Sequence, residues 1–498
     1  MINAKNKALL AIAITSTLSL MQICAQGETL SGGGSLESEV LELSVEDSVV
    51  YAVTNSFEAK LAKLDLLIAE TRELYSEAVF DTLLFGDIGY WEDKRQTVSV
   101  FSGDDRQTNL YSTGIKKELL SGTELMVSWS DQRDWVNSSF VSTNPAHNAQ
   151  LTLEAKQPIL KNAFGFVDRG KLTITRLAIM NADLETKERI EILASEVEKQ
   201  YWNVVFQKNT LDINKDMLEK ARALYNLNVD NYDMGLIERP DILASEANVL
   251  VREKDVILAE EEYKRSQENL KFLMNISDNT EIRPSADFNI VAENYDLAES
   301  LKTAFENNRV YKKMKRDIEI SDIDLKIKGN QLWPELDLEG TFAMNGLEGD
   351  FSKAAGKTIV VDNTFYYAGA KFSFPLENSL ARSEYDRASF EKEKAIVSLK
   401  QEERSIITRI GNSFRAVMAL NSAVMKVSKA SRLQADKLSE EEKRFFSGRS
   451  RTKILIDYQT DLLNAEMFEA RELFAREVAR VNMEKEMNIL LKKYEEFL

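Results

Sequence analysis

The side chains that carry most enzyme chemistry are nearly absent from this chain. His147 is the single histidine and Cys24 the single cysteine among 498 residues. Any Ser-His-Asp arrangement would have to be built around His147, which we expect in a loop beside Pro145, as an ordinary surface residue. Carboxylates are plentiful, but runs such as Glu260–Glu262 and Glu440–Glu442 are typical of solvated helix faces. We therefore expect no enzymatic activity, no cofactor and no metal site.

Two turns carry the residues that we single out as candidates for function. Gly235 and Pro240 separate two long stretches that otherwise contain neither glycine nor proline. Glycine just past the end of one helix and proline at the start of the next predict a tight helix–turn–helix. Gly448 interrupts a second very long predicted helix, with Arg449 and Arg451 beside it. The segments that flank these turns must position whatever function the chain has.

Composition narrows the class of protein. Hydrophobic residues are 44% and charged residues 29% of the chain, which fits neither a disordered protein nor a helical membrane protein. The formal net charge of −17 argues against nucleic acid as a partner, because phosphate binding needs a basic surface.

The N-terminus predicts export. Lys5 and Lys7 precede an apolar run at Ala8–Ile23, a pattern typical of a signal peptide over residues 1–25, followed by a linker over 26–42. An N-terminal membrane anchor and a lipidated Cys24 are alternatives. No later stretch approaches the roughly 18 apolar residues of a membrane helix, so any membrane span must consist of strands.

The rest of the chain reads as one unit repeated twice. The first repeat, residues 43–280, has a helix, then strands at about 81–158, a long helix at about 165–233 and a shorter helix at about 240–276. The second repeat, residues 281–498, has a helix at about 297–328, strands at about 334–374, a long helix at about 380–446 and a helix at about 452–494. Gln157-Pro158-Ile159 matches Phe374-Pro375-Leu376 at an offset of 217, and Gly235 matches Gly448 at an offset of 213. Such duplication indicates a fold with two equivalent halves.

The first long helix carries two apolar stripes. One stripe repeats every seven residues, as in a coiled-coil seam, and comprises Ile190, Val197, Val204, Leu211, Leu218, Tyr225 and Tyr232. The other is displaced by two residues, about 200° around the helix, and comprises Phe206, Ile213 and Leu227. Stripes on opposite sides favour a helix with a neighbour on each flank, as in the wall of a hollow cylinder. A plain two-stranded coiled coil is the alternative.

The strand regions alternate between apolar and polar residues. Leu125, Val127 and Trp129 alternate with polar neighbours, and so do Phe372 and Phe374 in the second repeat. A barrel wall between lipid and a wet lumen has this pattern, and so has a half-buried soluble sheet. One chain has too few strands to close a barrel, which suggests closure by several copies.

These features together resemble the TolC family of outer-membrane efflux and secretion channels, across essentially the whole mature chain. The resemblance rests on the duplicated unit, on Gln157-Pro158-Ile159-Leu160 and Phe374-Pro375-Leu376, and on the segments around Gly235 and Gly448. It implies a mainly α fold with β, in which a trimeric α-barrel of long coiled-coil helices continues into a β-barrel to which each protomer gives about four strands. Residues 109–131 depart from it as an extra hairpin, for which we favour an elongated hairpin or loop over added barrel strands.

The resemblance also implies roles for the turns. Gly235, Leu236 and Gly448 would lie at periplasmic tips that dock an adaptor. Asp241, Asp457, Arg449 and Arg451 would line the aperture that the tips close, where a ring of Asp457 carboxylates would favour cations.

Two positions depart from the family pattern at the aperture. Ile454 stands where the family often has a second aspartate, and Ser450 stands where it has a gating arginine. A double acidic ring is therefore not expected, and Arg449 or Arg451 would have to replace the gating arginine.

Two functions follow as hypotheses. The first is the outer-membrane channel of a tripartite efflux or type I secretion system, a homotrimeric passive duct between periplasm and exterior. Its partners would be an inner-membrane transporter, a periplasmic membrane-fusion adaptor and outer-membrane lipid, but not nucleic acid. The alternative is a secreted or periplasmic coiled-coil structural or adaptor protein without channel activity. The cargo, whether drug, metal or protein, is not encoded in these patterns.

Overall fold

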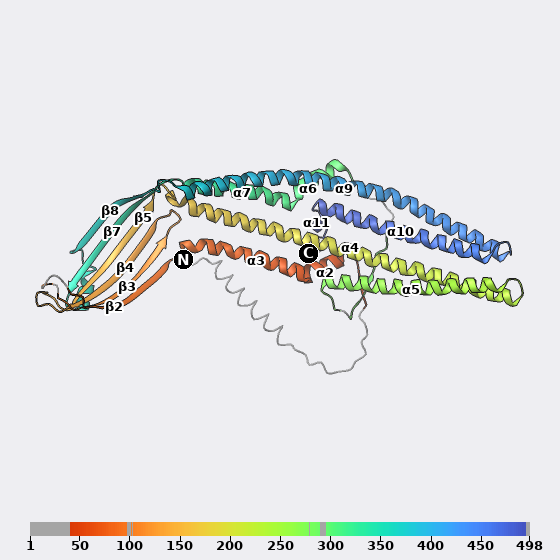
Figure 1. Ribbon diagram of the computed structural model, residues 1–498, viewed down its shortest axis with the longest axis horizontal. Helices are drawn as coiled ribbons and strands as arrows, with labels where there is room; N and C mark the ends of the chain where they lie inside the picture. The colour runs from red at the N-terminus through yellow and green to blue at the C-terminus, as the bar shows by residue number, and fades with distance from the viewer. Residues whose placement is uncertain (1–39, 97–100, 102, 278, 289–294, 495–498) are drawn as a thin grey trace, which may run out of the picture.

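The computed structural model describes residues 40–96, 101, 103–277, 279–288 and 295–494. The predicted signal peptide and most of the predicted linker therefore lie outside the described residues. A six-stranded sheet forms one end of the elongated molecule, and long helices extend from it to two turns at the other end (Figure 1).

Helices form most of the body. They are α2 (Val45–Asn55), α3 (Phe57–Glu77), α4 (Phe166–Asp233), α5 (Arg239–Met274), α6 (Leu297–Asn307), α7 (Arg309–Asn330), α8 (Phe351–Lys357), α9 (Ser379–Phe446), α10 (Thr452–Glu486) and α11 (Leu490–Tyr494). The stretch expected as one helix from residue 297 is broken at Asn308, which caps α7 with its side chain. The last expected helix is likewise divided, into α10 and α11.

The helix α4 has neighbours on both flanks. Near the turns it packs between α5 and α10, and nearer the sheet it packs between α3 and α7 (Figure 1). The predicted seam residues Val197, Val204 and Leu211 are buried. This confirms the two-stripe interpretation and excludes a plain two-stranded coiled coil for α4.

The helical wall is four helices wide along its whole length. Near the sheet the order of neighbours is α3, α4, α7, α9, and near the turns it is α5, α4, α10, α9. Its outer helices α3, α5 and α9 leave apolar side chains exposed, among them Leu64, Leu250 and Phe390.

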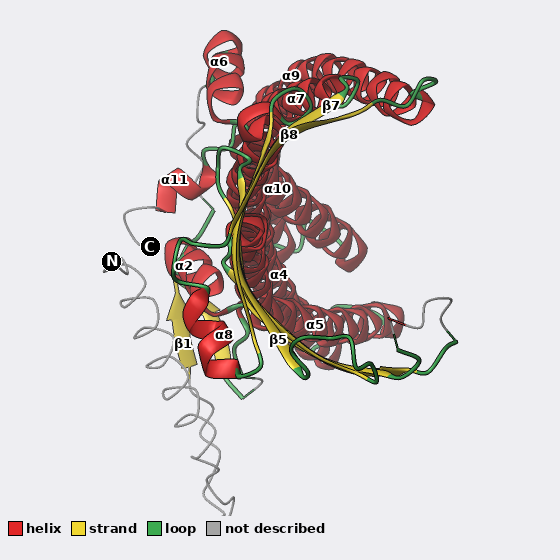
Figure 2. Ribbon diagram, turned by 90° about the vertical axis from the view of Figure 1, so that its left-hand side faces the viewer, coloured by secondary structure: helices red, strands yellow, loops and turns green. Residues whose placement is uncertain are grey.

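A small outer layer packs against one side of the helical wall, at its middle (Figure 2). A parallel pair of strands, β1 (Val40–Leu43) and β6 (Glu281–Pro284), lies with α2 against α4. The linker predicted over 26–42 therefore overlaps a strand. The largest apolar core lies here and contains Val49, Tyr201 and Leu270. None of the helices in the described part of the chain is long and apolar enough to cross a membrane.

The sheet has six strands, so the expectation of about four per protomer is wrong. The order is β2 (Leu83–Asp93), β3 (Arg106–Glu118), β4 (Glu124–Val136), β5 (Ala146–Pro158), β7 (Glu335–Glu348) and β8 (Thr364–Ser373), each antiparallel to its neighbour. Residues 109–131 are not a loop. They supply most of β3 and β4, which are fully paired between β2 and β5.

The two faces of the sheet differ in polarity. One row across all six strands is apolar and consists of Leu84, Ile115, Val127, Leu153, Phe342 and Tyr366. A row on the opposite face is polar and consists of Asp87, Ser112, Ser130, Gln150 and Asn345. The helix α8 packs on the apolar face through Phe351, against Trp129, and this face is the convex one (Figure 2). These rows are apolar on the convex side and polar on the concave side, while the edge strands β2 and β8 also place Leu83, Trp91, Phe365 and Tyr367 on the concave side.

The turn of the β3–β4 hairpin is locked against the start of α4. Gly122 and Gly165 both have left-handed backbones, with φ of 69° each. A Cβ on Gly165 would lie 2.3 Å from the carbonyl oxygen of Leu120, so only glycine allows this approach. Gln157 also donates from Nε2 to the carbonyl of Ser121 at 3.1 Å. The hairpin is therefore joined to the helical wall.

Replacing Gly165 with alanine is expected to destabilise this corner more than the left-handed backbone alone requires. That backbone costs about 1–2 kcal/mol for a non-glycine residue, and the clash with Leu120 adds to it. The matched control is Gly235→Ala, since Gly235 has φ of 75° and no atom within 4 Å of an added Cβ. Apparent unfolding midpoints in detergent measure both, and equal losses would disprove a steric role for the glycine contact.

Candidate channel wall and tips

The first turn lies at the end of the molecule farthest from the sheet. The helix α4 ends at Asp233, and the amides of Gly235 and Leu236 donate back to the carbonyls of Tyr232 and Asn231 at 2.8 Å each. A positive φ at Gly235 permits this Schellman-like ending. Pro240 stands in the first turn of α5, where its missing amide hydrogen costs nothing.

The second turn repeats this geometry. The amides of Gly448 and Arg449 donate to the carbonyls of Phe445 and Arg444 at 2.9 Å each, and Gly448 has φ of 71°. The structure thus places both predicted glycines at helix–helix turns, where each is exposed and without packing that explains its identity.

Buried polar contacts join the two turns. Asn228 of α4 donates from Nδ2 to the carbonyl of Asp241 at 3.4 Å and accepts from the hydroxyl of Thr452 at 3.4 Å. Farther along, Arg252 of α5 donates to the hydroxyl of Thr460 in α10 at 2.9 Å. Sequence reasoning missed these residues, although a polar side chain at a helix seam is a signal that could have found them.

The predicted aperture residues are placed as follows. Asp241 lies half-buried in the first turn of α5, and Asp457 is exposed in the second turn of α10. Arg449 is exposed in the turn, and Arg451 is the exposed cap residue of α10. All four lie near the tips, but the two aspartates are on different helix pairs. Ser450 donates to Glu441, which also receives Arg444, so the position of the family's gating arginine is tied to its own helix pair.

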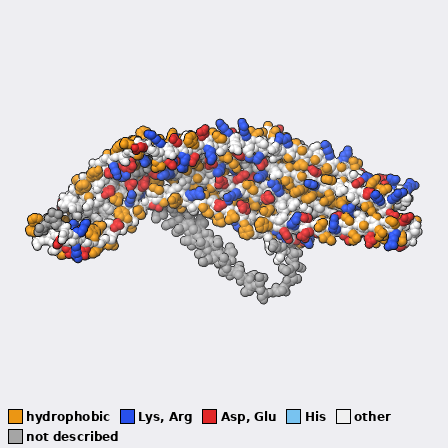
Figure 3. Space-filling model, in the orientation of Figure 1, with side chains coloured by type: hydrophobic (Ala, Val, Ile, Leu, Met, Phe, Trp, Pro, Cys, Tyr) orange, Lys and Arg blue, Asp and Glu red, His pale blue; other side chains and the backbone are white. Residues whose placement is uncertain are grey.

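The two tips carry opposite charge. Figure 3 shows Lys and Arg side chains gathered at the end of the α9–α10 pair. Residues 443–453 include five cations, Lys443, Arg444, Arg449, Arg451 and Lys453, of which the first two pair with Glu440 and Glu441. The α4–α5 tip has four carboxylates against Arg239: Asp230, Asp233, Glu238 and Asp241. The charged residues of each turn can be read from the sequence, but the difference in charge between the turns is visible only when the two are compared.

A buried ionic cluster holds the middle of the wall. Arg480 of α10 donates to Glu198, Glu477 and Glu484 at 2.7, 2.9 and 2.8 Å. The hydroxyl of Tyr494 in α11 donates to the other oxygen of Glu198 at 2.7 Å. Burial opposes ionisation of Glu198, but Arg480, Lys493 and Tyr494 together hold its pKa below the usual value.

A second buried carboxylate fastens α11. Glu191 of α4 accepts from the amides of Leu490 and Leu491 at 2.8 and 3.3 Å, and from Arg309 at 2.9 Å. The carboxylate therefore pairs with Arg309 at the start of α7 and caps the first amides of α11. Neither Glu191 nor Glu198 was singled out from the sequence.

His147 lies in β5, not in the loop that we expected. It is largely covered, because its Nδ1 lies 2.8 Å from Asp131 and its ring packs against Phe351 of α8. The alternation of β5 continues up to the residue after Pro145, so the proline marks the start of a strand. No group of three or more potential metal-binding His, Cys, Asp or Glu side chains occurs among the described residues.

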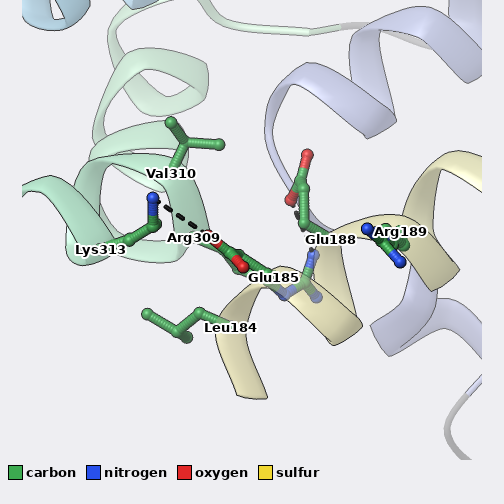
Figure 4. A pocket seen from close by; sticks show the side chains of 7 residues that line it. All are labelled: Leu184, Glu185, Glu188, Arg189, Arg309, Val310 and Lys313. Carbon is green, nitrogen blue, oxygen red and sulfur yellow. Dashed lines mark ion pairs between the residues drawn. The ribbon is translucent and has the colours of Figure 1, made fainter. Parts of the chain in front are cut away.

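A cavity of about 340 Å³ lies between α4 and α7, and its lining is mostly charged. Figure 4 shows Lys313 facing Glu185, which it pairs with at 3.0 Å, and Arg309 lies 3.5 Å from Glu188. These ion pairs join α4 to α7 across the helix seam.

Solved structures share this fold, whereas no family model and no curated protein matches the sequence. CusC, described in terms of folding and transmembrane channel formation, superposes with a TM-score of 0.69 at 12% identity, over 92% of this chain and 95% of that chain. The Campylobacter jejuni CmeC outer membrane channel gives 0.65 at 13% identity, over 89% and 85%. The open state of the Neisseria gonorrhoeae MtrE outer membrane channel gives 0.65 at 13% identity, over 92% and 93%. The TolC-like fold predicted from the sequence is therefore confirmed.

Proposed function

We propose that this chain is an outer-membrane export channel, a passive duct in which three copies join their helical walls and sheets. The observation that carries the proposal is the continuous wall, whose sheet has an apolar row across its convex face and a polar row across its concave face. The shared fold with CusC, CmeC and MtrE supports it. The sheet would lie in the outer membrane and the helices in the periplasm.

The edges of the wall support assembly with further copies. On α5 an exposed apolar line repeats every seven residues, through Leu243, Leu250 and Ile257. On the opposite edge α9 exposes Phe390 and Val397, also seven residues apart. Nearer the turns, at the height of α5, α9 exposes Met425 and Leu433. Exposed apolar side chains on both edges suit helix–helix contacts with further copies, so each protomer would present one edge to each neighbour.

We infer the partners from the family resemblance and the gate from the charges of the tips. An inner-membrane transporter and a periplasmic adaptor would supply energy and selectivity in efflux or type I secretion, with the adaptor docking at Gly235, Leu236 and Gly448. Because the α4–α5 tip is acidic and the α9–α10 tip basic, tips of adjacent copies would attract one another and close the periplasmic mouth.

The test of the function is assembly and conductance. The full chain, purified in detergent, is expected to have the mass of a trimer and to conduct ions across a planar bilayer. A monomer that stays soluble without detergent and does not conduct would overturn the proposal and favour the coiled-coil structural protein.

Replacing Asp457 with asparagine is expected to weaken cation preference. Three carboxylates at about 8 Å from a water-filled axis stabilise a monovalent cation by about 1.5 kcal/mol in total, roughly a tenfold enrichment. Reversal potentials in a salt gradient measure the change. The control is Glu299→Gln, which removes a carboxylate from exposed α6 on the convex side (Figure 2). If both variants keep wild-type selectivity, Asp457 lies outside the constriction.

A further inference from the structure

The six-stranded sheet ends in two strands that have no partner within the chain. The strand order begins with β2 and finishes with β8, each of which is paired on one side only. Six strands are also fewer than the roughly eight that close the smallest barrels. Figure 2 shows the result as an open arc, whose two edges carry unpaired backbone groups.

The two edges fit one another. Every strand is antiparallel to its neighbour, so with an even number of strands β2 runs away from the helices and β8 runs back toward them. A β8 edge therefore meets the β2 edge of another copy in antiparallel orientation. The strands are of similar length, with 11 and 10 residues. Leu84 and Ile88 continue the apolar face from Tyr366 and Phe372, so the join also matches lipid side to lipid side.

The β3–β4 hairpin makes the sheet as wide as the helical wall. At a spacing of about 4.8 Å and a tilt of about 40°, six strands cover an arc of about 38 Å. Four helices abreast, at about 8–10 Å between axes, cover about 32–40 Å. Four strands would cover only about 25 Å by the same measure. The anchored contact between Gly122 and Gly165 holds β3 and β4 within this arc.

We propose that three copies close an eighteen-stranded barrel, in which β3 and β4 of every copy are wall strands. The partner of each sheet edge is a second copy of this chain. This inference rests on the proposed function and departs from the twelve-stranded barrel that the family resemblance implied.

An eighteen-stranded barrel has a wide lumen. Its backbone diameter is about 36 Å, against about 24 Å for twelve strands at the same tilt. Side chains occupy about 5 Å on each side of the lumen. The open diameter is then about 26 Å for eighteen strands and about 14 Å for twelve. A helix with its side chains is about 10–12 Å across. The larger lumen admits a helical hairpin or a compact peptide, so the cargo class that the outer pore allows includes folded polypeptide segments.

The deciding experiment counts the strands. Single-particle imaging of the full-length protein in lipid nanodiscs is expected to show eighteen strands in the membrane section. Twelve strands in a conducting trimer, with β3 and β4 outside the wall, would overturn this inference and leave the proposed function intact. A non-conducting monomer would overturn both.

A second measurement tests the width. Neutral polyethylene glycols added from the side of the sheet are expected to enter the lumen, and so lower its conductance, up to a diameter of about 26 Å. A variant without residues 106–136 joins β2 to β5 at the outer end and retains four strands. Its cut-off is expected to fall about 1.8-fold. A wild-type cut-off near 14 Å would overturn the inference even if the shortened variant does not fold.

Discussion

Replacing Arg480 with methionine is expected to destabilise the protein by about 3–5 kcal/mol, because the loss leaves buried carboxylates without their shared cation. Glu198 is fully buried, and Glu477 and Glu484 are nearly so. In the variant Glu477 keeps Arg476 at 2.7 Å, and Lys493 lies 3.6 Å from both Glu198 and Glu484, so the remaining cations neutralise only part of this charge. Urea unfolding of the assembled protein in detergent, followed by the helical signal, measures the loss.

The pH dependence of the Arg480 variant distinguishes a charge effect from a packing effect. Without Arg480, we expect burial, the largest influence on Glu198, to outweigh Lys493 and Tyr494 and to raise the pKa of Glu198 above its value in the unfolded chain. A raised folded-state pKa makes stability fall as pH rises, so the variant is expected to be closest to wild type near pH 5 and furthest from it near pH 8. A loss of stability that does not change with pH would show that lost packing, and not unpaired charge, is responsible.

The matched control for Arg480 is Arg222→Met. Arg222 pairs with Glu253 at 2.7 Å, but both side chains are largely exposed. Exposed pairs contribute about 0–1 kcal/mol, so this variant should remain near wild type. Adding Glu198→Gln to the Arg480 variant is expected to restore part of the stability, since one buried charge is removed.

Replacing Glu191 with alanine is expected to cost a comparable 3–5 kcal/mol, roughly, and to release the C-terminal helix. The amides of Leu490 and Leu491 would be buried without an acceptor, and Arg309 would keep only Glu188 at 3.5 Å. Limited proteolysis is expected to cleave near α11 in the variant before it cleaves wild type. Glu191→Gln keeps an acceptor but loses the charge and should lie between them.

The control for Glu191 is its neighbour Glu185 on the same helix. Glu185 pairs with Lys313 at 3.0 Å but is more than half exposed. Its replacement by alanine should leave the proteolysis pattern unchanged. Equal release of α11 in both variants would contradict the capping role of Glu191.

The elements that sequence reasoning located best are those with long-range periodicity. The buried line through Val197, Val204 and Leu211 extends over many turns, so chance cannot imitate it. The turns at Gly235 and Gly448 were also predictable, because a left-handed residue after a helix favours glycine strongly.

The strand count was harder to predict for a physical reason. A membrane strand alternates over about ten residues and has only weak signal, and β3 interrupts its alternation with Leu110 on the polar face and Thr113 on the apolar face. The pattern in β4, with Val127 and Trp129, was visible, but pairing between β3 and β4 depends on contacts that alternation does not specify. The resemblance then favoured four strands over six.

The burial of Glu191 and Glu198 could not be predicted from their residue type. Glu191 and Glu198 are seven residues apart and share a face of α4 beside the seam at Val197. Charged residues beside a seam usually reach solvent, so sequence reasoning assigns them to the surface. Only the approach of α10 and α11, distant in sequence, encloses them.

The unpaired edges of β2 and β8 have a consequence before any channel exists. An isolated copy would expose two strand edges beside an apolar sheet face, which is the combination that drives strand-to-strand aggregation. In the proposed trimer, folding and association would therefore be coupled, and the lifetime of a lone copy would be limited by how soon it meets two others. Apparent stability is then expected to rise with protein concentration, because association covers the edges of β2 and β8.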